Sequence, residues 1–250
     1  MGIKERKHTE VPRYSKEAQV TAIIQETPYP VVTPAGVYPP QEDSQLLVDT
    51  LMDSGLAPRR RVADLCTGSG LVAVAAAMMG ARDVMAFEIS PDAVDCAEAN
   101  AYVAGVSVNI LCGSWTLAME HGPFDVVTAN PPYVPAGPTV HTEVIPVSAG
   151  PARAWNAGPD GRMILDPLCD SATDLLADGG TLLIVQSAFA DAPQSLRRLR
   201  SAGLKAQVVA SQWIPFGPVL TARAKWLEDT GQLAIGQRQE ELVVIRADKP

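Results

Sequence analysis

Short apolar runs alternate with helical segments along most of the chain. The apolar runs are rich in Val, Ile, Leu and Ala and lie at residues 61–65, 83–87, 106–111, 124–129, 181–185, 206–210 and 241–245. Segments with helical spacing separate most of them, at 43–55, 71–79, 90–105, 162–176 and 192–202. Strands that are joined through helices pair in parallel by crossover connections. The sequence therefore predicts an α/β fold with one doubly wound, mostly parallel sheet. Its last strand follows an irregular insertion at 215–233 and is predicted to run antiparallel.

The first 36 residues differ from the rest of the chain. Pro28, Pro30 and Pro34 interrupt any regular element there, because proline removes a backbone donor and fixes its own φ angle. We expect residues 1–36 to form an irregular N-terminal arm. The remaining residues, 37–250, are expected to form a single domain with a large hydrophobic core.

The composition argues against several classes of partner. The 20 Lys and Arg are outnumbered by 28 Asp and Glu, and the net charge of −8 disfavours a broad grip on nucleic acid. The N-terminus, MGIKERKHTE, lacks the apolar run of a signal peptide, and no uncharged stretch is long and apolar enough to span a bilayer. No C-x-x-C pair indicates a metal site or a disulfide framework. We expect a cytoplasmic protein without nucleic acid, membrane or metal partners, and buried free thiols at Cys66, Cys96, Cys112 and Cys169.

A glycine-rich turn follows the first predicted strand. In DLCTGSGLVAVAAA, residues 64–77, Gly68 and Gly70 are followed by Ala73. Small residues at these positions allow a sharp corner and a close approach of a ligand to the backbone. Glu88, at the end of the next strand, has the spacing at which a carboxylate accepts both hydroxyls of a ribose. A dinucleotide and S-adenosylmethionine both fit this pattern. The simpler alternative is a glycine turn without a ligand and an ordinary acidic residue near a helix N-terminus.

The strand at 124–129 leads into Asn130-Pro131-Pro132-Tyr133. Neither proline can continue a ladder of hydrogen bonds, so the two prolines hold the backbone in a fixed shape. The Asn130 side-chain oxygen and the Pro131 carbonyl can each accept one N–H of a planar nitrogen, and the Tyr133 ring can stack on the flat group. Positioning of this kind suits transfer of a methyl group to a nitrogen whose lone pair is delocalised. We therefore predict that Asn130, Pro131, Pro132 and Tyr133 form the catalytic clamp.

Together, DLCTGSG, FEISPDA and NPPYV resemble class I S-adenosylmethionine-dependent methyltransferases, in particular the HemK/PrmC-type protein glutamine N5-methyltransferases. GVYPPQEDSQLL (36–47) is similar to a segment of the short archaeal and eukaryotic branch, and ARAWNAGPDGRMILD (152–166) looks like the substrate-side loop of that family. PFGPVLTARAKWLE (215–228) suggests a bacterial, actinobacterial member. The resemblance implies a Rossmann-like methyltransferase domain at 37–250 with a seven-stranded sheet.

The resemblance also implies a set of site residues. Together with the glycine turn, those around S-adenosylmethionine would be Ser44, Asp64, Cys66, Gly68, Gly70, Glu88, Ser114, Trp115 and Asn130. Those around the substrate would be Tyr38, Asn130, Pro131, Tyr133 and Trp155. Two positions depart from the family, which usually has glycine at the position of Cys66 and aspartate at that of Ser114. The separate N-terminal helical domain of PrmC has no counterpart before Gly36.

Several functions remain open at this point. The leading interpretation is methylation of a glutamine amide in a peptide-chain release factor. The alternative is N-methylation of a small-molecule guanidino or amide metabolite. Adenine methylation of nucleic acid, which the acidic charge disfavours, and an inactive cofactor-binding subunit are weaker candidates. The resemblance also makes the strand at 106–111 a sheet edge. We expect a homodimer or the N-terminal arm to cover it, rather than the zinc-binding activator protein of archaeal and eukaryotic relatives.

Overall fold

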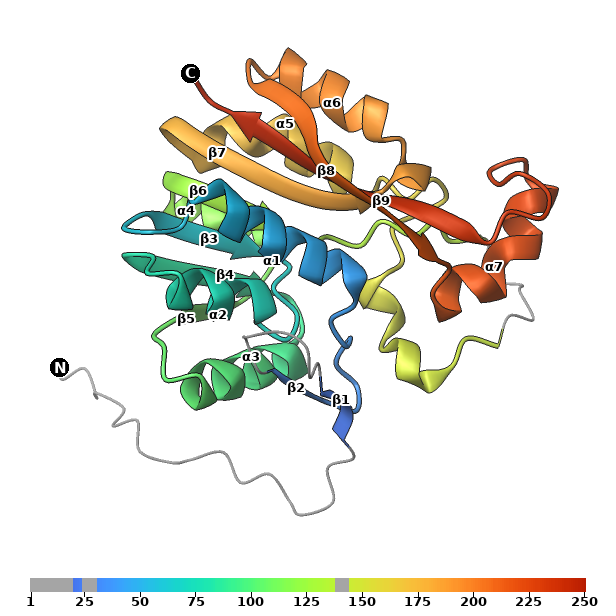
Figure 1. The fold of residues 1–250 in the computed structure, drawn as a ribbon, viewed down its shortest axis with the longest axis horizontal. Coiled ribbons are helices and arrows are strands. Elements are labelled where there is room, and N and C mark those ends of the chain that lie inside the picture. Colours follow the sequence, from blue (N-terminus) through green and yellow to red (C-terminus); the bar gives the residue numbers. More distant parts are fainter. Residues whose placement is uncertain (1–19, 24–30, 138–143) are drawn as a thin grey trace, which may run out of the picture.

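The computed structural model describes residues 20–23, 31–137 and 144–250. A seven-stranded sheet lies at its centre (Figure 1), with the strand order β5-β4-β3-β6-β7-β9-β8. The strands are β3 (Arg61–Leu65), β4 (Asp83–Glu88), β5 (Asn109–Cys112), β6 (Phe124–Ala129), β7 (Leu176–Ser187), β8 (Lys205–Pro215) and β9 (Gln239–Asp248). The pairs from β5 to β7 are parallel, whereas β9 runs antiparallel to both β7 and β8. The predicted mostly parallel sheet with an antiparallel last strand is confirmed.

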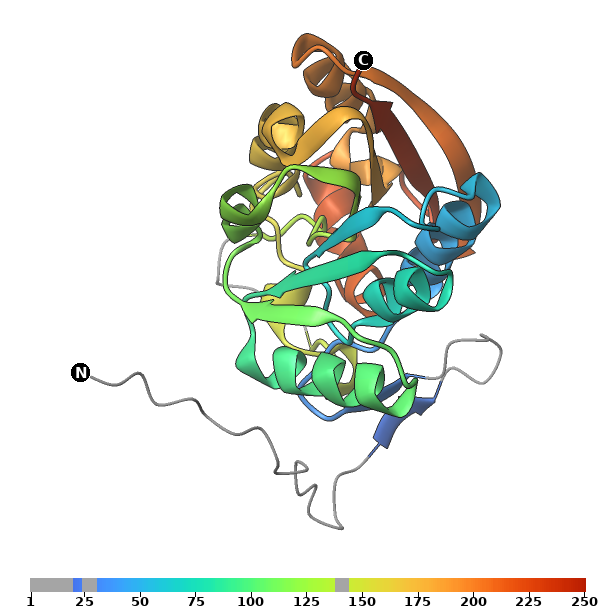
Figure 2. The same cartoon turned by 90° about the vertical axis from the view of Figure 1, so that its left-hand side faces the viewer.

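Helices cover both faces of the sheet, as the side view in Figure 2 shows. On one face lie α1 (Glu42–Ser54), α2 (Leu71–Met78) and α3 (Pro91–Val103). On the other lie α4 (Ala118–His121), α5 (Leu165–Leu175) and α6 (Ala192–Ser201). This arrangement follows from the alternation of strands and helices, because crossovers between parallel strands place helices on the sheet faces.

Two apolar cores fill the space between the sheet and the helices. On the side of α1, Leu47 and Leu51 belong to one core with Val62 of β3. On the side of α5, Leu168 belongs to a second core with Phe124 of β6. These side chains are fully buried, and burial of each stabilises the fold by about 1.5–3 kcal/mol relative to exposure. The strands read as continuous apolar runs because both of their faces are covered.

The segment at 215–233, which was predicted to be irregular, contains a helix. α7 (Pro218–Asp229) connects β8 to β9. Leu220 and Leu227 are buried on its inner side, where they belong to a third apolar cluster. The prolines of this segment suggest a break in regular structure. However, Pro218 occupies the first helical turn, where its missing N–H would have had no intrahelical partner.

The prediction of an irregular arm is wrong for part of residues 1–36. β1 (Val20–Ile23) pairs antiparallel with β2 (Val32–Pro34). The Asn100 side chain on α3 donates to the Val32 carbonyl at 3.1 Å and accepts from the Val32 N–H at 3.0 Å. The proline in β2 is its last residue, where a missing N–H breaks no interior pair. β2 is thereby attached to α3, and the boundary between arm and domain stays a prediction.

The strand predicted at 106–111 begins later than expected. β5 covers Asn109–Cys112 and, among the strands that the structure describes, has β4 as its one partner, so it is an edge of the sheet as predicted. Cys96 and Cys169 are buried as predicted, whereas Cys66 is only partly buried and Cys112 is exposed, which contradicts the prediction for Cys112. An edge strand leaves part of its side chains in solvent even where the local sequence is apolar. All four cysteines are free.

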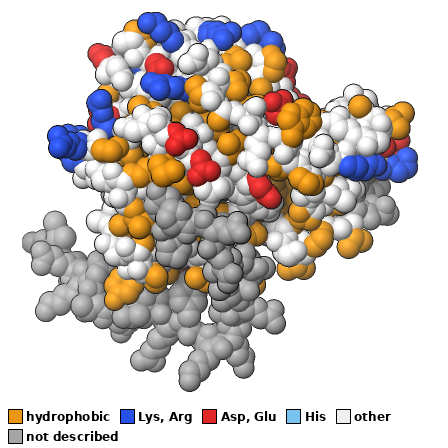
Figure 3. Space-filling view, in the orientation of Figure 1, with side chains coloured by type: hydrophobic (Ala, Val, Ile, Leu, Met, Phe, Trp, Pro, Cys, Tyr) orange, Lys and Arg blue, Asp and Glu red, His pale blue; other side chains and the backbone are white. Residues whose placement is uncertain are grey.

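No helix in residues 20–23, 31–137 and 144–250 is long and apolar enough to cross a membrane. In the same ranges, no three His, Cys, Asp or Glu side chains lie together as a metal site would need. On the face in Figure 3, Lys and Arg lie mainly along the upper margin and at the two sides, and hydrophobic side chains spread over the middle and lower right.

Gly70 sets the distance between two helices. It is the N-cap of α2, with φ +83°, a conformation that costs an L-residue about 1–2 kcal/mol. A Cβ built on Gly70 would lie 2.9 Å from the Cβ of Ala97 on α3. The backbone of α2 therefore approaches α3 more closely than any side chain would allow.

We expect Gly70→Ala to lower the free energy of unfolding by about 2–4 kcal/mol, since it adds overpacking to backbone strain. Gly80→Ala is the matched control, because Gly80 also has a positive φ (+87°) but nothing within 4 Å of its Cβ position. That control should lose only about 1–2 kcal/mol. Urea unfolding measures both, and equal losses would show that the contact with Ala97 relaxes freely.

Candidate active site

A cavity of about 460 Å³ opens at the carboxyl ends of β3, β4 and β6. This is where the order of the sheet reverses, and open α/β sheets bind ligands at this point. The volume lies within the range of about 300–1,000 Å³ that is usual for small-molecule sites. The predicted site residues that line it are Tyr38, Ser44, Asp64, Cys66, Gly68, Glu88, Ser114, Trp115, Asn130, Pro131, Pro132, Tyr133 and Trp155. Gly70 does not line it and acts on packing behind the turn, and the roles of the lining residues stay predictions.

The turn after β3 is shaped by residues with left-handed backbone angles and by a carboxylate. Cys66 has φ +57° and Gly68 has φ +56°, so the position of Cys66 is one that glycine adopts without strain. The Gly68 N–H donates to Glu88 Oε2 and the Ser90 N–H donates to Glu88 Oε1, both at 2.9 Å. Each carboxylate oxygen keeps further acceptor capacity. Glu88 is therefore held in a fixed orientation and can still accept hydroxyl groups from a ligand.

Asp64 is a buried carboxylate between two hydroxyl groups. Thr67 Oγ1 donates to its Oδ2 at 2.5 Å, and Thr128 Oγ1 donates to its Oδ1 at 2.7 Å. The second contact follows from the register of the sheet, which aligns Asp64 of β3 with Thr128 of β6. Burial raises the pKa of Asp64 to about 6, and the two hydroxyl donors oppose that rise. A carboxylate in such surroundings favours a cationic group in the cavity.

The Asn130 amide is held in one orientation by α1. Its Nδ2 donates to Ser44 Oγ at 3.1 Å. Within the described residues, no group donates to Asn130 Oδ1 or to the Pro131 carbonyl. Both oxygens are therefore open acceptors at a site that lines the cavity. This is the arrangement expected for a clamp that accepts two N–H groups.

The Tyr133 hydroxyl is held by Asp43, the residue before Ser44. It donates to Asp43 Oδ2 at 2.9 Å. Burial, and then the negative charge of Asp43, raise the pKa of the Tyr133 phenol well above its ordinary value. The hydroxyl therefore keeps its proton and remains a donor to Asp43. The ring is held at the cavity wall by this bond and by packing against two apolar clusters.

The backbone after the clamp is pinned by a loop from residues 155–161. The Val134 N–H donates to the Trp155 carbonyl at 2.9 Å, and the Val134 carbonyl accepts from Ala157 at 3.0 Å. A Cβ on Gly161, which has φ +75°, would overlap the Tyr133 carbonyl oxygen. The loop thus lies directly against the backbone of Tyr133.

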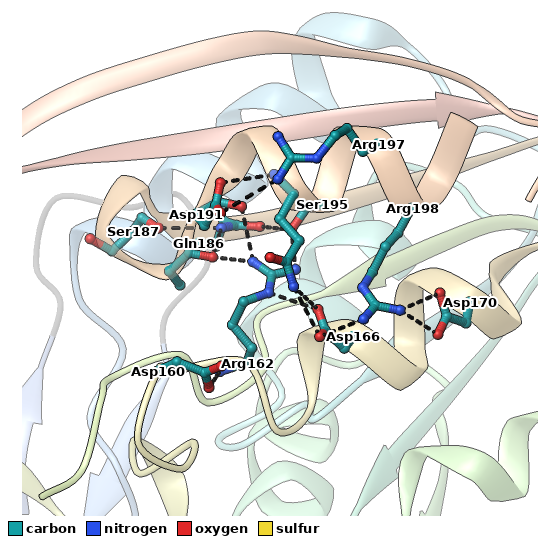
Figure 4. A network of polar contacts seen from close by, with 12 residues as sticks. Asp160, Arg162, Asp166, Asp170, Gln186, Ser187, Asp191, Ser195, Arg197 and Arg198 are labelled. Carbon is teal, nitrogen blue, oxygen red and sulfur yellow. Dashed lines mark hydrogen bonds and ion pairs between the residues drawn. The ribbon is translucent and has the colours of Figure 1, made fainter. Parts of the chain in front are cut away.

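Arg162 anchors this loop to the rest of the fold (Figure 4). Its side chain is 3% exposed and donates to Asp166 Oδ1 at 2.7 Å, to Ser195 Oγ at 3.0 Å and to the Ala190 carbonyl. Ser195 Oγ in turn donates to Gln186 Oε1 at 2.6 Å. The network joins the loop to β7 and α6, and Arg162 is a satisfied structural cation rather than a ligand group.

The remaining predicted residues make contacts that are typical of a surface turn or an apolar core. Ser114 is exposed, and its Oγ accepts from the Thr116 N–H at 3.4 Å at the start of a short 3₁₀ turn. Trp115 is buried in the core beside α5. Trp155 is also buried, and the Arg223 guanidinium lies 4.7 Å from its ring centroid. Trp155 therefore contributes to the apolar wall as much as to the cavity.

Two cavity residues were missed by sequence reasoning. Asp43 is 5% exposed and contacts both Ser44 and Tyr133. Its signal was present in QEDS, where an acidic residue directly precedes Ser44. Arg153 donates to Ser90 Oγ at 2.5 Å across the cavity. Nothing in the sequence distinguishes it from an ordinary surface arginine.

In sequence, the chain is similar to methyltransferases. Residues 29–149 match the model of the methyltransferase small domain. A relative from Methanocaldococcus jannaschii, named "putative protein N5-glutamine methyltransferase", is 31% identical over 188 residues, which is 75% of this chain and 91% of that protein. A release factor glutamine methyltransferase of Mycolicibacterium smegmatis is 36% identical over 58% of this chain and 52% of its own length. The chain thus spans about half the length of that bacterial relative.

Solved structures share the fold. A complex from E. cuniculi, responsible for methylation of the eRF1 translation termination factor, matches with a TM-score of 0.57 and 20% identity, over 86% of this chain and 99% of that one. A 16S rRNA N2 methyltransferase of T. thermophilus, solved with AdoMet and guanosine, matches with a TM-score of 0.56 and 19% identity, over 93% of this chain and 50% of that one. At such identities the likeness concerns the fold alone.

The affinity for the predicted cofactor is expected to fall in acid. S-adenosylmethionine carries positive charge, so it favours the ionised form of Asp64, whose pKa is raised to about 6. Below that pH the carboxylate takes up a proton, and affinity should drop by about tenfold between pH 7 and pH 5. Calorimetric titrations across this range measure the drop. Asp64→Asn should bind more weakly and with a nearly flat pH profile, and the same slope in this variant would assign the effect to another group.

Proposed function

Since the chain belongs to the HemK/PrmC-type protein glutamine N5-methyltransferases, a family that uses S-adenosylmethionine, we propose that it methylates a glutamine side-chain amide in a peptide-chain release factor. The observation that carries the proposal is the orientation of Asn130. With Nδ2 bound to Ser44 Oγ at 3.1 Å, the acceptor Oδ1 is available to an N–H donor. A planar amide NH₂ group offers two such donors, one for Asn130 Oδ1 and one for the Pro131 carbonyl.

The cavity residues fit the cofactor by their chemistry. S-adenosylmethionine supplies an electrophilic methyl group and brings hydroxyl donors and cationic groups. Glu88, oriented by the N–H groups of Gly68 and Ser90, would accept the ribose hydroxyls. Asp64, a buried carboxylate, would face a cationic group. The open backbone at Gly68, where nothing lies within 4 Å of the Cβ position, leaves room for a ligand beside the turn.

The clamp acts on the nitrogen by position and polarity. An amide nitrogen is a poor nucleophile because its lone pair is delocalised. Two fixed acceptors, Asn130 Oδ1 and the Pro131 carbonyl, would draw on both N–H bonds and hold the nitrogen in one place. The Tyr133 ring, whose hydroxyl is bound to Asp43, would cover one face of the amide.

Transfer of labelled methyl from S-adenosylmethionine to purified release factors tests the proposal. We expect label in the glutamine of the Gly-Gly-Gln loop and none when that glutamine is replaced by alanine. An extract of small metabolites serves as the competing acceptor. Label that enters only the metabolites would assign the enzyme to small-molecule N-methylation.

Asn130→Ala should lower turnover by about a hundredfold or more, since it removes an acceptor that positions the nitrogen. Binding of S-adenosylmethionine should change only by a small factor, because the groups assigned to the ribose and to the cationic part remain. Single-turnover rates and calorimetry separate the two effects. Near-normal turnover of the variant would remove Asn130 from the clamp.

The expected homodimer also stays a prediction. β5 has β4 as its neighbour on one side only, and Asn109 and Cys112 are exposed. Among the described residues no strand pairs with its outer edge. Such an edge is a surface at which a second copy could add a strand.

A further inference from the structure

One carboxylate links the two polar side chains of the clamp. Tyr133 donates to Asp43 Oδ2 at 2.9 Å. Asp43 Oδ1 accepts from the Ser44 N–H at 2.6 Å and lies 3.3 Å from Ser44 Oγ. Ser44 Oγ is in turn 3.1 Å from Asn130 Nδ2. Asp43 and Ser44 come from the start of α1, whereas Asn130 and Tyr133 follow β6.

Asp43 determines which group donates and which accepts along this chain of hydrogen bonds. An ionised carboxylate only accepts hydrogen bonds, so the Ser44 hydroxyl directs its proton to Asp43. The Ser44 oxygen is then left with lone pairs alone and must accept from its other neighbour. On Asn130 the group that can donate is the NH₂ end of the amide. The amide oxygen is consequently turned away from Ser44.

Asp43 lies among other acidic groups at the N-terminus of α1. It lies in the first turn of α1, a 13-residue helix whose N-terminus favours a negative group. Glu42 is its neighbour in the same turn but is exposed. Burial, and then the charges of Asp43 and Glu240 of β9, raise the pKa of both Tyr38 and Tyr133. Among these acidic groups, Asp43 is the one with hydrogen bonds to the clamp.

We propose that Asp43 is a positioning residue that fixes which end of the Asn130 amide faces the substrate and holds the Tyr133 ring in place. Without the negative acceptor, the Ser44 hydroxyl can rotate and donate to Asn130, and the amide can turn its nitrogen toward the substrate. That orientation presents donors to a substrate group that is itself a donor. The inference rests on the proposed function for its effect on turnover, but the orientation of the amide exists without any substrate.

The variant Asp43→Asn keeps the shape of the side chain and replaces one acceptor oxygen by a donor. We expect turnover to fall by about tenfold to a hundredfold, as for other small displacements of a reacting group, with S-adenosylmethionine affinity changed less than about threefold. Glu42→Gln is the matched control, because it removes the same charge from the same helical turn at an exposed side chain. The control should keep its turnover within about twofold.

A second measurement is independent of the substrate. The side-chain NH₂ signals of Asn130, assigned by their loss in Asn130→Ala, report its hydrogen bond to Ser44 in the free protein by NMR. Asp43→Asn should shift these signals and speed their exchange with water, while Glu42→Gln leaves them in place. If release factors are not methylated at all, the proposed function fails, whereas the NMR comparison still decides the role of Asp43.

Unchanged Asn130 signals in Asp43→Asn would overturn the proposal, and so would a loss of turnover equal to that of Glu42→Gln. If Asp43→Asn does not fold, Ser44→Ala replaces it, because this variant keeps the Asp43 carboxylate and removes the hydroxyl that connects it to Asn130. The same shift of the Asn130 signals is then expected. The double variant Asp43→Asn/Ser44→Ala should lose no more turnover than the larger single loss, since both act through one hydrogen-bonded chain. Additive losses would contradict a shared route.

Discussion

The parallel pairing of β3 with β6 is the constraint on which the site depends. Its register aligns Asp64 with Thr128 and Leu65 with Ala129. The chain segments that leave the two strands therefore start side by side, although more than sixty residues separate them in the sequence. One segment is the glycine turn, and the other begins with Asn130. A shift by one residue would turn the Thr128 hydroxyl away from Asp64 and bury the wrong side chains on both faces.

The sheet alone does not complete the clamp. α1 precedes β3 in the chain, yet its first turn lies against the end of β6 and holds Asn130 through Ser44. The loop before α5 reaches the same place from the other side and is fixed by Arg162. α1, the end of β6 and the loop before α5 thus meet at residues 130–133. Short polar contacts there fix side-chain orientations that local propensity and apolar packing do not determine.

Much of this arrangement could be predicted from the sequence, for identifiable reasons. The strands at 61–65 and 124–129 were predicted with their observed bounds, because they are apolar runs that end in glycine or proline signals. Asp43 was missed because its significance lies in a contact with Tyr133, ninety residues away, and such contacts have no periodic signal. α7 was missed because a proline that starts a helix looks the same as one that breaks it. The exposure of Cys112 depends on the order of strands in the sheet, which the local pattern does not contain.

The position of β9 bears on the order in which the chain can fold as it is made. β9 follows β8 in the sequence but lies between β7 and β8 in the sheet. On the ribosome, β8 therefore has no neighbour in the sheet until residues 239–248 have been synthesised. During that interval an eleven-residue strand with an exposed tryptophan, Trp213, stays unpaired, the kind of strand that invites contact with other nascent chains. The last strand to be synthesised, β9, is therefore the one that joins β8, at the edge of the sheet, to β7.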